Sequence, residues 1–170
     1  VYLASSNNAL GFYRYDIVGN LWSTKINPPT ATRSQLTNDG TYVYVMGIDN
    51  TVYKYNPESG QWADAMEGPG NMVANAVGFF KWFNDGFYYL DDGDSTMHVY
   101  RDNSWSSFDL GGEGSSAGTY DMANDELYIR TMWEMGFRVV DTTDDSIARV
   151  ITDITKVQEN SRTGSYYDGN

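Results

Sequence analysis

Polar and apolar residues alternate along much of the chain, and elsewhere apolar residues form short runs rich in β-branched and aromatic side chains. Gly, Asn and Asp interrupt these stretches at short, regular intervals. The pattern predicts short β-strands joined by turns, because an amphipathic helix would repeat its apolar positions every three to four residues. Only residues 152–159 favour a turn or two of helix. The clearest stretch predicts strands at residues 33–37, 42–46, 51–56 and 61–66.

A repeat of about 42 residues underlies these strands. Its equivalent positions are Tyr15, Tyr55, Tyr100 and Val140, which are separated by 40, 45 and 40 residues. In the first two repeats a Trp follows the Tyr by seven residues. Four short strands in each of four repeats predict an all-β protein, a β-propeller of four four-stranded blades.

Predicted hairpin turns support the same division. An Asn-Asp pair precedes an aromatic-rich strand in three repeats, at residues 38–39, 84–85 and 124–125, and Gly follows the first two pairs. Asp-Gly between apolar strands is a strong hairpin signal, because Asn, Asp and Gly tolerate the positive φ angles of tight turns. We therefore expect the first two strands of each of these blades to form a hairpin.

The two ends of the sequence complete the fourfold pattern. Residues 166–170 resemble the first strand and turn of a blade, and residues 1–4 resemble the strand that follows. We expect a single domain, 1–170, whose repeats are approximately 1–29 plus 163–170, 30–69, 70–112 and 113–162. Three arrangements remain open: a closed ring in which the C-terminal strand completes the N-terminal blade, a piece of a larger propeller, and a polymer in which that strand completes a neighbouring subunit's blade.

Residues 29–66 resemble a kelch repeat. The resemblance rests on Arg33, the strand at 42–47 that ends in Met-Gly, the Val-Tyr-Lys-Tyr-Asn-Pro run at 52–57, and Trp62. The other three repeats match more loosely, with Met-Gly or Asp-Gly where the family has paired glycines. The resemblance implies blades of a kelch-like propeller, a fold that serves many unrelated functions.

Charge and composition exclude several classes of partner and site. The chain has 23 acidic and 11 basic residues and a net charge of −12, which argues against nucleic acid or an anionic membrane surface as partner. It has no Cys, so a thiolate nucleophile, a disulfide and a Cys-ligated metal are excluded. No apolar stretch reaches the ~20 residues that cross a bilayer. No cofactor is indicated except a Ca²⁺ ion.

Two groups of residues are candidate binding sites. Aromatic rings could stack on a sugar while guanidinium groups bind an anionic substituent of it. The candidate residues for such a sugar site are Trp82, Trp133, Arg130 and Arg33. A loop rich in carboxylates could bind Ca²⁺ through Asp91, Asp92 and Asp94. The structural alternatives are that the aromatic rings pack between blades and that the Asp side chains cap their own turns.

The sequence contains no specific catalytic motif. We expect a non-catalytic structural or interaction module, extracellular or at the cell surface, which binds protein and can self-assemble through its terminal strands. Two alternatives stay open. One is a lectin-like propeller that binds glycans through its loops, and the other is a fragment of a larger propeller enzyme, a hydrolase or lyase, with its catalytic residues in other blades.

Overall fold

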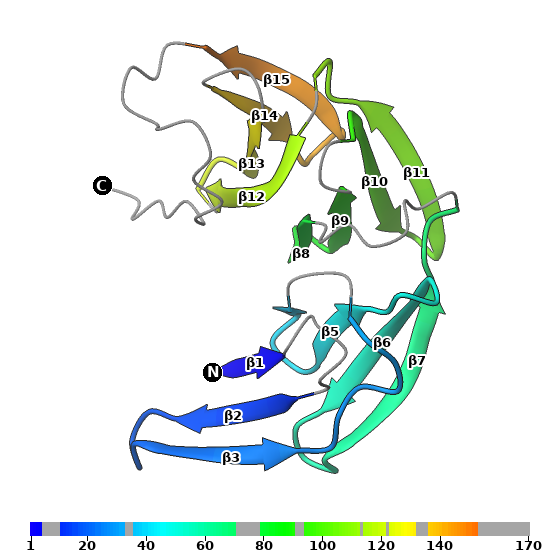
Figure 1. The fold of residues 1–170 in the computed structure, drawn as a ribbon. Coiled ribbons are helices and arrows are strands. Elements are labelled where there is room, and N and C mark those ends of the chain that lie inside the picture. Colours follow the sequence, from blue (N-terminus) through cyan, green and yellow to red (C-terminus); the bar gives the residue numbers. More distant parts are fainter. Residues whose placement is uncertain are drawn as a thin grey trace. The chain divides into compact units, whose positions relative to one another are not determined.

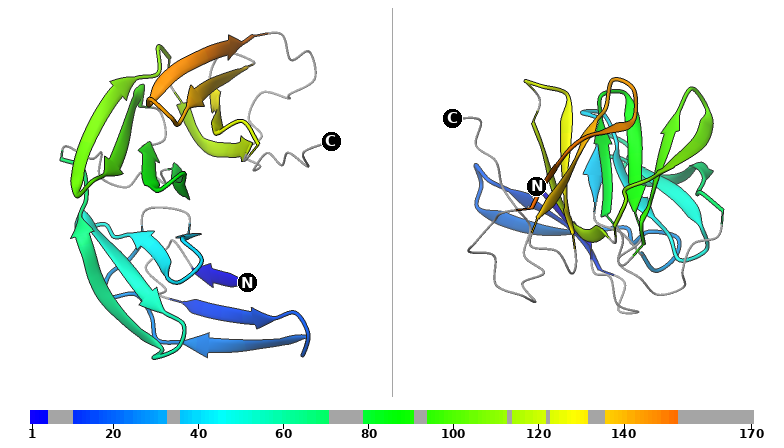
Figure 2. Two further views of the ribbon diagram at one scale, coloured as in Figure 1. Left: turned by 180° about the vertical axis from the view of Figure 1, so that it is seen from behind. Right: turned by 90° about the horizontal axis from the view of Figure 1, so that it is seen from above.

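The computed structural model confirms the all-β prediction (Figure 1). It describes residues 1–4, 11–32, 36–70, 79–90, 94–112, 114–121, 123–131 and 136–152. Every regular element in these ranges is a β-strand, and the strands form four antiparallel sheets that can be followed from two further directions in Figure 2. No helix able to cross a bilayer occurs among these residues.

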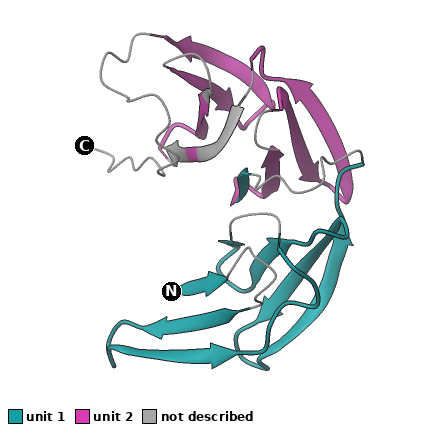
Figure 3. Ribbon diagram, in the orientation of Figure 1, with its two compact units in different colours: residues 1–81 teal, residues 82–170 magenta. Residues whose placement is uncertain are grey.

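The chain divides into two compact units, residues 1–81 and 82–170, and each is described by itself (Figure 3). The first unit holds a sheet of three described strands in the order β1-β2-β3 and a sheet of four in the order β4-β5-β6-β7. These strands are β1 (Tyr2–Ala4), β2 (Phe12–Asp16), β3 (Leu21–Lys25), β4 (Thr37–Asn38), β5 (Val43–Met46), β6 (Thr51–Asn56) and β7 (Gln61–Glu67).

The second unit holds two further sheets, and the division between the units falls within β8. The strand orders are β8-β9-β10-β11 and β12-β13-β14-β15. Their strands are β8 (Phe79–Phe83), β9 (Gly86–Leu90), β10 (Thr96–Arg101), β11 (Ser104–Asp109), β12 (Gly114–Asp121), β13 (Glu126–Thr131), β14 (Phe137–Asp141) and β15 (Ser146–Ile151). Each of the four sheets falls within one of the predicted repeats.

The predicted hairpin turns are present. Asn84 and Asp85, between β8 and β9, have φ angles of 45° and 58°, which are the positive values that a two-residue hairpin turn of the favoured hand requires. Gly40, in the turn between β4 and β5, has a φ of 90°. Asp125, before β13, has a φ of 54°. The local chemistry that predicted these turns therefore also explains their geometry.

Several Asp and Asn side chains form hydrogen bonds within the turns between strands. Their side-chain oxygens accept the backbone N–H two residues later in the chain, which is the geometry of an Asx turn. The residues that do so are Asp16, Asn38, Asp39, Asp49, Asn56, Asp94, Asp109 and Asp141. Part of the negative charge therefore stabilises the connections between strands.

In the second unit a guanidinium group joins the third sheet to the loop before β15. Arg101, at the end of β10, lies 3.0 Å from the carboxylate of Asp145 and donates to the hydroxyl of Tyr88 and the carbonyl oxygen of Thr142. Tyr88 also donates to Asp145 at 2.7 Å. Burial, followed by the Asp145 contact, raises the pKa of this buried tyrosine. The network connects residues more than forty positions apart in the sequence.

Two predicted elements lie outside the described residues: most of the helical segment at 152–159, and the strand at 163–170. The predicted strand at 33–37 is described only from residue 36, and β4 begins at Thr37. The arrangement of the four sheets as the blades of one propeller stays a prediction.

Candidate functional site

The first sheet has two faces with different surroundings. Alternate residues of a strand point to opposite faces, and residues paired across strands share a face. The pairs Tyr2 with Arg14 and Ala4 with Phe12 therefore define one face, called the covered face. The opposite face, called the open face, carries the apolar or aromatic side chains of Val1, Leu3, Tyr13, Tyr15 and Trp22, together with the polar Thr24, which pairs with Tyr13.

The covered face packs against the second sheet. Phe12 is 0% exposed, and its ring lies 4.9 Å from the ring of Tyr55 and 5.0 Å from that of Trp62. Tyr2 stacks on Phe12 at 5.4 Å, and Val43 belongs to the same buried cluster. Aromatic pairs at these separations stabilise beyond the area that they bury. This cluster fixes the first sheet to the second within the first unit.

The open face is mostly apolar, and four of its apolar or aromatic side chains are exposed. Val1 is 67% exposed, Leu3 55%, Trp22 58% and Tyr13 37%. The rings of Tyr15 and Trp22 lie 4.9 Å apart, so they form one continuous patch. Contiguous apolar patches on a protein surface mark interaction sites far more often than single exposed side chains do.

In the second sheet, the face equivalent to the open face packs against a neighbouring sheet. Its residues equivalent to the open face are Val43, Val45, Tyr53, Tyr55 and Trp62. The first four are buried, and Tyr55 and Trp62 contact the ring of Phe12 on the covered face of the first sheet. The open face thus carries the same types of residue as a face that buries itself against a neighbouring sheet.

One edge of β1 is also open. Val1 exchanges two backbone hydrogen bonds with Tyr15 of the sheet, at 3.1 and 2.9 Å. In an antiparallel pair every second residue bonds to the partner strand, so Tyr2 and Ala4 direct their backbone N–H and C=O groups away from β2. No strand within the described ranges pairs with this edge of β1. An unpaired edge is a template for an added strand.

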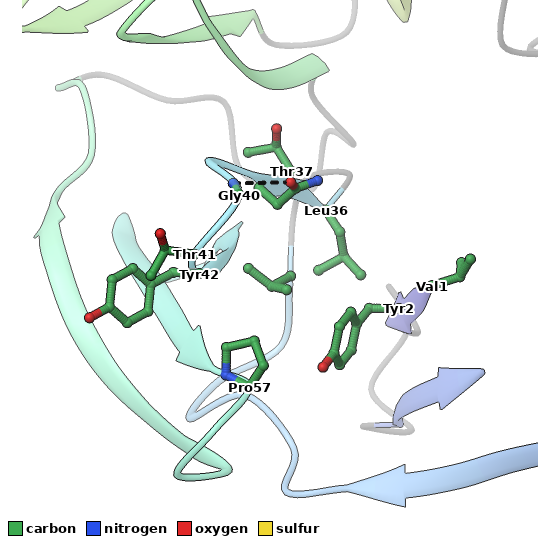
Figure 4. Close-up of a pocket in the computed structure, with 10 residues that line it drawn as sticks. Val1, Tyr2, Leu36, Thr37, Gly40, Thr41, Tyr42 and Pro57 are labelled. Atoms are coloured by element: carbon green, nitrogen blue, oxygen red, sulfur yellow. Dashed lines mark hydrogen bonds between the residues drawn. The ribbon is translucent and has the colours of Figure 1, made fainter. Parts of the chain in front are cut away.

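A pocket of about 480 Å³ lies beside this edge, within the first unit (Figure 4). Tyr2, Leu36 and Pro57 are labelled around it in Figure 4, and Val43 is also part of its lining. Its remaining described lining residues are Val1, Thr37, Asn38, Gly40, Thr41 and Tyr42. None of the side chains in this described lining is an acid or a base, so the pocket suits a neutral group with an apolar body.

Hydrogen bonds hold the turn at the rim of the pocket. The carboxylate of Asp39 accepts the N–H groups of Thr41 and Tyr42, each at 2.8 Å, and the hydroxyl of Tyr44 at 2.7 Å. Burial by itself would raise the pKa of Asp39, but these three donors outweigh it and lower the pKa. Burial and the Asp39 contact raise the pKa of Tyr44. The rim of the pocket is therefore held in place around an ionised carboxylate.

The predicted sugar-binding residues are only partly described. Trp82, in β8, is half-buried, and its ring packs edge-on against Phe87 at 4.7 Å. Arg130 is half-buried in β13, a strand of a different sheet. Arg33 and Trp133 lie outside the described residues. A sugar site built from these four residues stays a prediction.

The candidate calcium loop is also only partly described. The Asp94 carboxylate accepts the backbone N–H of Ser95 at 2.7 Å and of Thr96 at 3.1 Å, so this oxygen caps its own turn. Asp91 and Asp92 lie outside the described residues. No group of three or more His, Asp or Glu side chains that could hold a metal ion occurs within the described part of the chain. A Ca²⁺ site at this loop stays a prediction.

The open face and the pocket were not found from the sequence. The repeated Tyr-to-Trp spacing located the side chains of the open face, but it did not show that no described sheet of the first unit covers them. The pocket combines residues from β1, β4 and two turns, and no motif connects these segments. No protein-family model matches this chain, and no curated protein matches its sequence.

Proposed function

We propose that this chain is a non-catalytic structural or interaction module, a kelch-like propeller of four sheets, whose open face binds another β-sheet. The partner is protein, and the sheet that covers the open face comes from this chain itself, in a closed ring or in a neighbouring copy. The strand at 163–170 is the proposed fourth strand of the first sheet. An extracellular or cell-surface location belongs to the same proposal.

The open face is the observation that carries this proposal. Its five apolar and aromatic side chains match, position by position, five side chains of the second sheet, four of which are buried. Removal of apolar side chains from water is favourable. Sheets that pack face to face use rows of side chains of this kind. A strand face made for water would instead carry polar residues.

Oxidative footprinting of the full chain tests the proposal directly. Hydroxyl radicals modify exposed aromatic and aliphatic side chains, and we expect Leu3, Tyr13 and Trp22 to be protected in the native chain. Denatured chain gives the unprotected rate. Protection that does not depend on concentration and accompanies a mass of 19.1 kDa indicates a closed ring, and protection that grows with concentration and mass indicates assembly. Modification at the denatured rate at every concentration would contradict the proposal.

A pair of variants tests whether the open face is responsible for the protection from radicals. Trp22→Ser removes the largest side chain of the open face, and Val150→Ser removes a similarly exposed apolar side chain from β15. We expect Trp22→Ser to remove the protection of Leu3 and Tyr13, because their cover loses its main contact, and Val150→Ser to leave it unchanged. Equal effects of the two substitutions would show that the face is not specific.

A further inference from the structure

The pocket of the first unit lies at a position that an ion pair fills in the second unit. We propose that this pocket binds one pyranose ring of a neutral hexose. The site goes beyond the proposed function, because the packing of another sheet on the open face does not need a ligand in the pocket. It is also built from other residues than the sugar site predicted from the sequence.

The register of the strands identifies the equivalent residues of the two units. Tyr2 in β1 is equivalent to Tyr88 in β9, because each follows the residue that pairs with the repeated tyrosine of its sheet. Pro57 directly follows β6, and Thr142 directly follows β14, the equivalent strand. The space between Tyr2 and Pro57 in the pocket is therefore equivalent to the space between Tyr88 and Thr142.

In the second unit, the guanidinium group of Arg101 fills this space. Its central carbon lies 6.0 Å from the centroid of the Tyr88 ring. It donates to the Tyr88 hydroxyl at 2.8 Å and to the carbonyl oxygen of Thr142 at 3.2 Å, and it lies 3.0 Å from the carboxylate of Asp145. A partly buried cation needs such partners, because burial removes its hydration.

Both members of this ion pair are replaced in the first unit. Asp16 stands at the position of Arg101, and its carboxylate accepts the backbone N–H of Val18 at 3.2 Å within its own turn. Gly60 stands at the position of Asp145, and the two residues have similar φ angles, 71° and 56°. The guanidinium group and its carboxylate are thus lost together, and the result is a pocket of about 480 Å³ with no charged side chain in its described lining.

The described lining combines apolar walls with a few polar groups, as ligand sites of about 300–1,000 Å³ commonly do. Tyr2 and Pro57 border the pocket from different sheets (Figure 4), and Val43 adds an aliphatic wall. Thr41 adds a hydroxyl group. The side-chain oxygen of Asn38 accepts the N–H of Gly40 at 3.2 Å, which leaves the amide nitrogen to donate to a ligand.

A neutral pyranose ring matches both parts of this lining. The C–H groups on its faces can pack against the aromatic ring of Tyr2, and its hydroxyl groups can bond to Asn38 and Thr41. A charged ligand would lose its hydration without gaining an ionic partner from the described lining. The pocket should therefore select a neutral sugar over its charged derivative.

Titration of the isotope-labelled full chain with sugars, followed by NMR, tests the inference. The probes are the methyl pyranosides of glucose, galactose and mannose. We expect at least one of them to cause saturable shifts of the amide signals of Tyr2, Thr41 and Val43 and to leave the signals of β10 unchanged. The corresponding uronate, which carries a carboxylate, should bind at least about ten-fold more weakly. The absence of shifts with all three sugars, or equal binding of the uronate, would overturn the inference.

A variant that restores the ion pair provides the second arm. Asp16→Arg combined with Gly60→Asp gives the first unit the pair that fills the equivalent space in the second unit. We expect this variant to bind the sugar at least about ten-fold more weakly, because its side chains occupy the pocket. Asp144→Asn makes the same change of net charge at an exposed turn of the second unit and should bind as the native chain does. Undiminished binding by the double variant would contradict the proposed site.

Two further measurements keep these outcomes distinct. The amide of Val45, buried in the second sheet, reports whether a variant has changed the fold. If the double variant does not fold, Thr41→Trp at the exposed rim of the pocket replaces it, with Thr143→Trp at an exposed turn of the second unit as its control. Radical footprinting of Trp22 is done without sugar, so loss of the sugar site and failure of the proposed function are observed separately.

Discussion

Replacement of Phe12 by Ala tests how strongly the covered face of the first sheet stabilises the first unit. Phe12 is 0% exposed, and three aromatic rings lie within 5.4 Å of its centroid. Loss of a buried Phe costs about 3–5 kcal/mol, and each aromatic pair adds about 0.5–1.5 kcal/mol beyond the buried area. We therefore expect Phe12→Ala to lower the free energy of unfolding of the first unit by about 5 kcal/mol.

An exposed residue of the same hairpin is the matched control. Val18, in the turn after β2, is 97% exposed, so Val18→Ala should lower the free energy of unfolding by about 0.5 kcal/mol or less. A loss of 5 kcal/mol is comparable to the whole stability of a small domain, so Phe12→Ala is expected to unfold the first unit easily. Phe12→Leu keeps most of the buried volume and should cost only about 1.5 kcal/mol, which keeps the comparison measurable.

Urea unfolding followed by amide NMR signals measures these losses. Signals from β6 report on the first unit and signals from β10 on the second, which matters because two units need not unfold in one transition. We expect Phe12→Leu to shift the midpoint of the β6 signals and to leave the β10 signals nearly unchanged. Equal losses for Phe12→Ala and Val18→Ala would refute the burial of Phe12 on the covered face.

Three further changes test other parts of the structure. Gly136→Ala would place a Cβ 2.1 Å from the backbone oxygen of Ile151, so we expect the thermal midpoint to fall by several degrees, whereas Gly70→Ala, which meets nothing within 4 Å, should leave it unchanged. Arg101→Lys loses the planar fork that joins a carboxylate, a tyrosine hydroxyl and backbone carbonyls, and should cost about 2 kcal/mol in urea unfolding. Burial, then a hydrogen bond to a carboxylate, raises the pKa of Tyr53 to about 12 from 10, so the stability that it contributes is complete below pH 10 and is lost as pH rises through 12. Tyr53→Phe should flatten the alkaline fall in stability, and an unchanged fall would contradict this pKa.

The strands and turns were predictable because they depend on local chemistry. Asn84 and Asp85 adopt positive φ angles that these residue types tolerate, and the strand alternation follows from the period of the backbone. The ion pair of Arg101 with Asp145 was not predictable, because the two residues are 44 positions apart, one at the end of β10 and the other in the turn between β14 and β15. Such a pairing depends on how sheets pack, which no local pattern records.

The candidate binding sites could also be predicted only in part from the sequence. The sequence identified Asp94 as a potential calcium ligand from its residue type, but the described hydrogen bonds use its carboxylate to cap a turn. The open face was not predicted, because its residue types do not show whether another sheet covers them. Tyr15 and Trp22 have the same types and spacing as Tyr55 and Trp62, but Trp22 is 58% exposed, whereas Tyr55 and Trp62 contact the ring of Phe12 in the first sheet.

In the proposed ring or assembly, the composition of the open face suits a first sheet that is an internal member of a stack. In a chain of structural repeats each repeat packs on its neighbours, and a repeat that ends the stack needs a polar outer face to remain soluble. Leu3, Tyr13 and Trp22 are instead apolar, as are the equivalent side chains that the second sheet buries. Polar substitutions at these three positions would convert the first sheet into a terminal cap. Such a variant should keep the urea midpoint of the β6 signals, because the covered face is unchanged, while it loses its ability to bind another sheet.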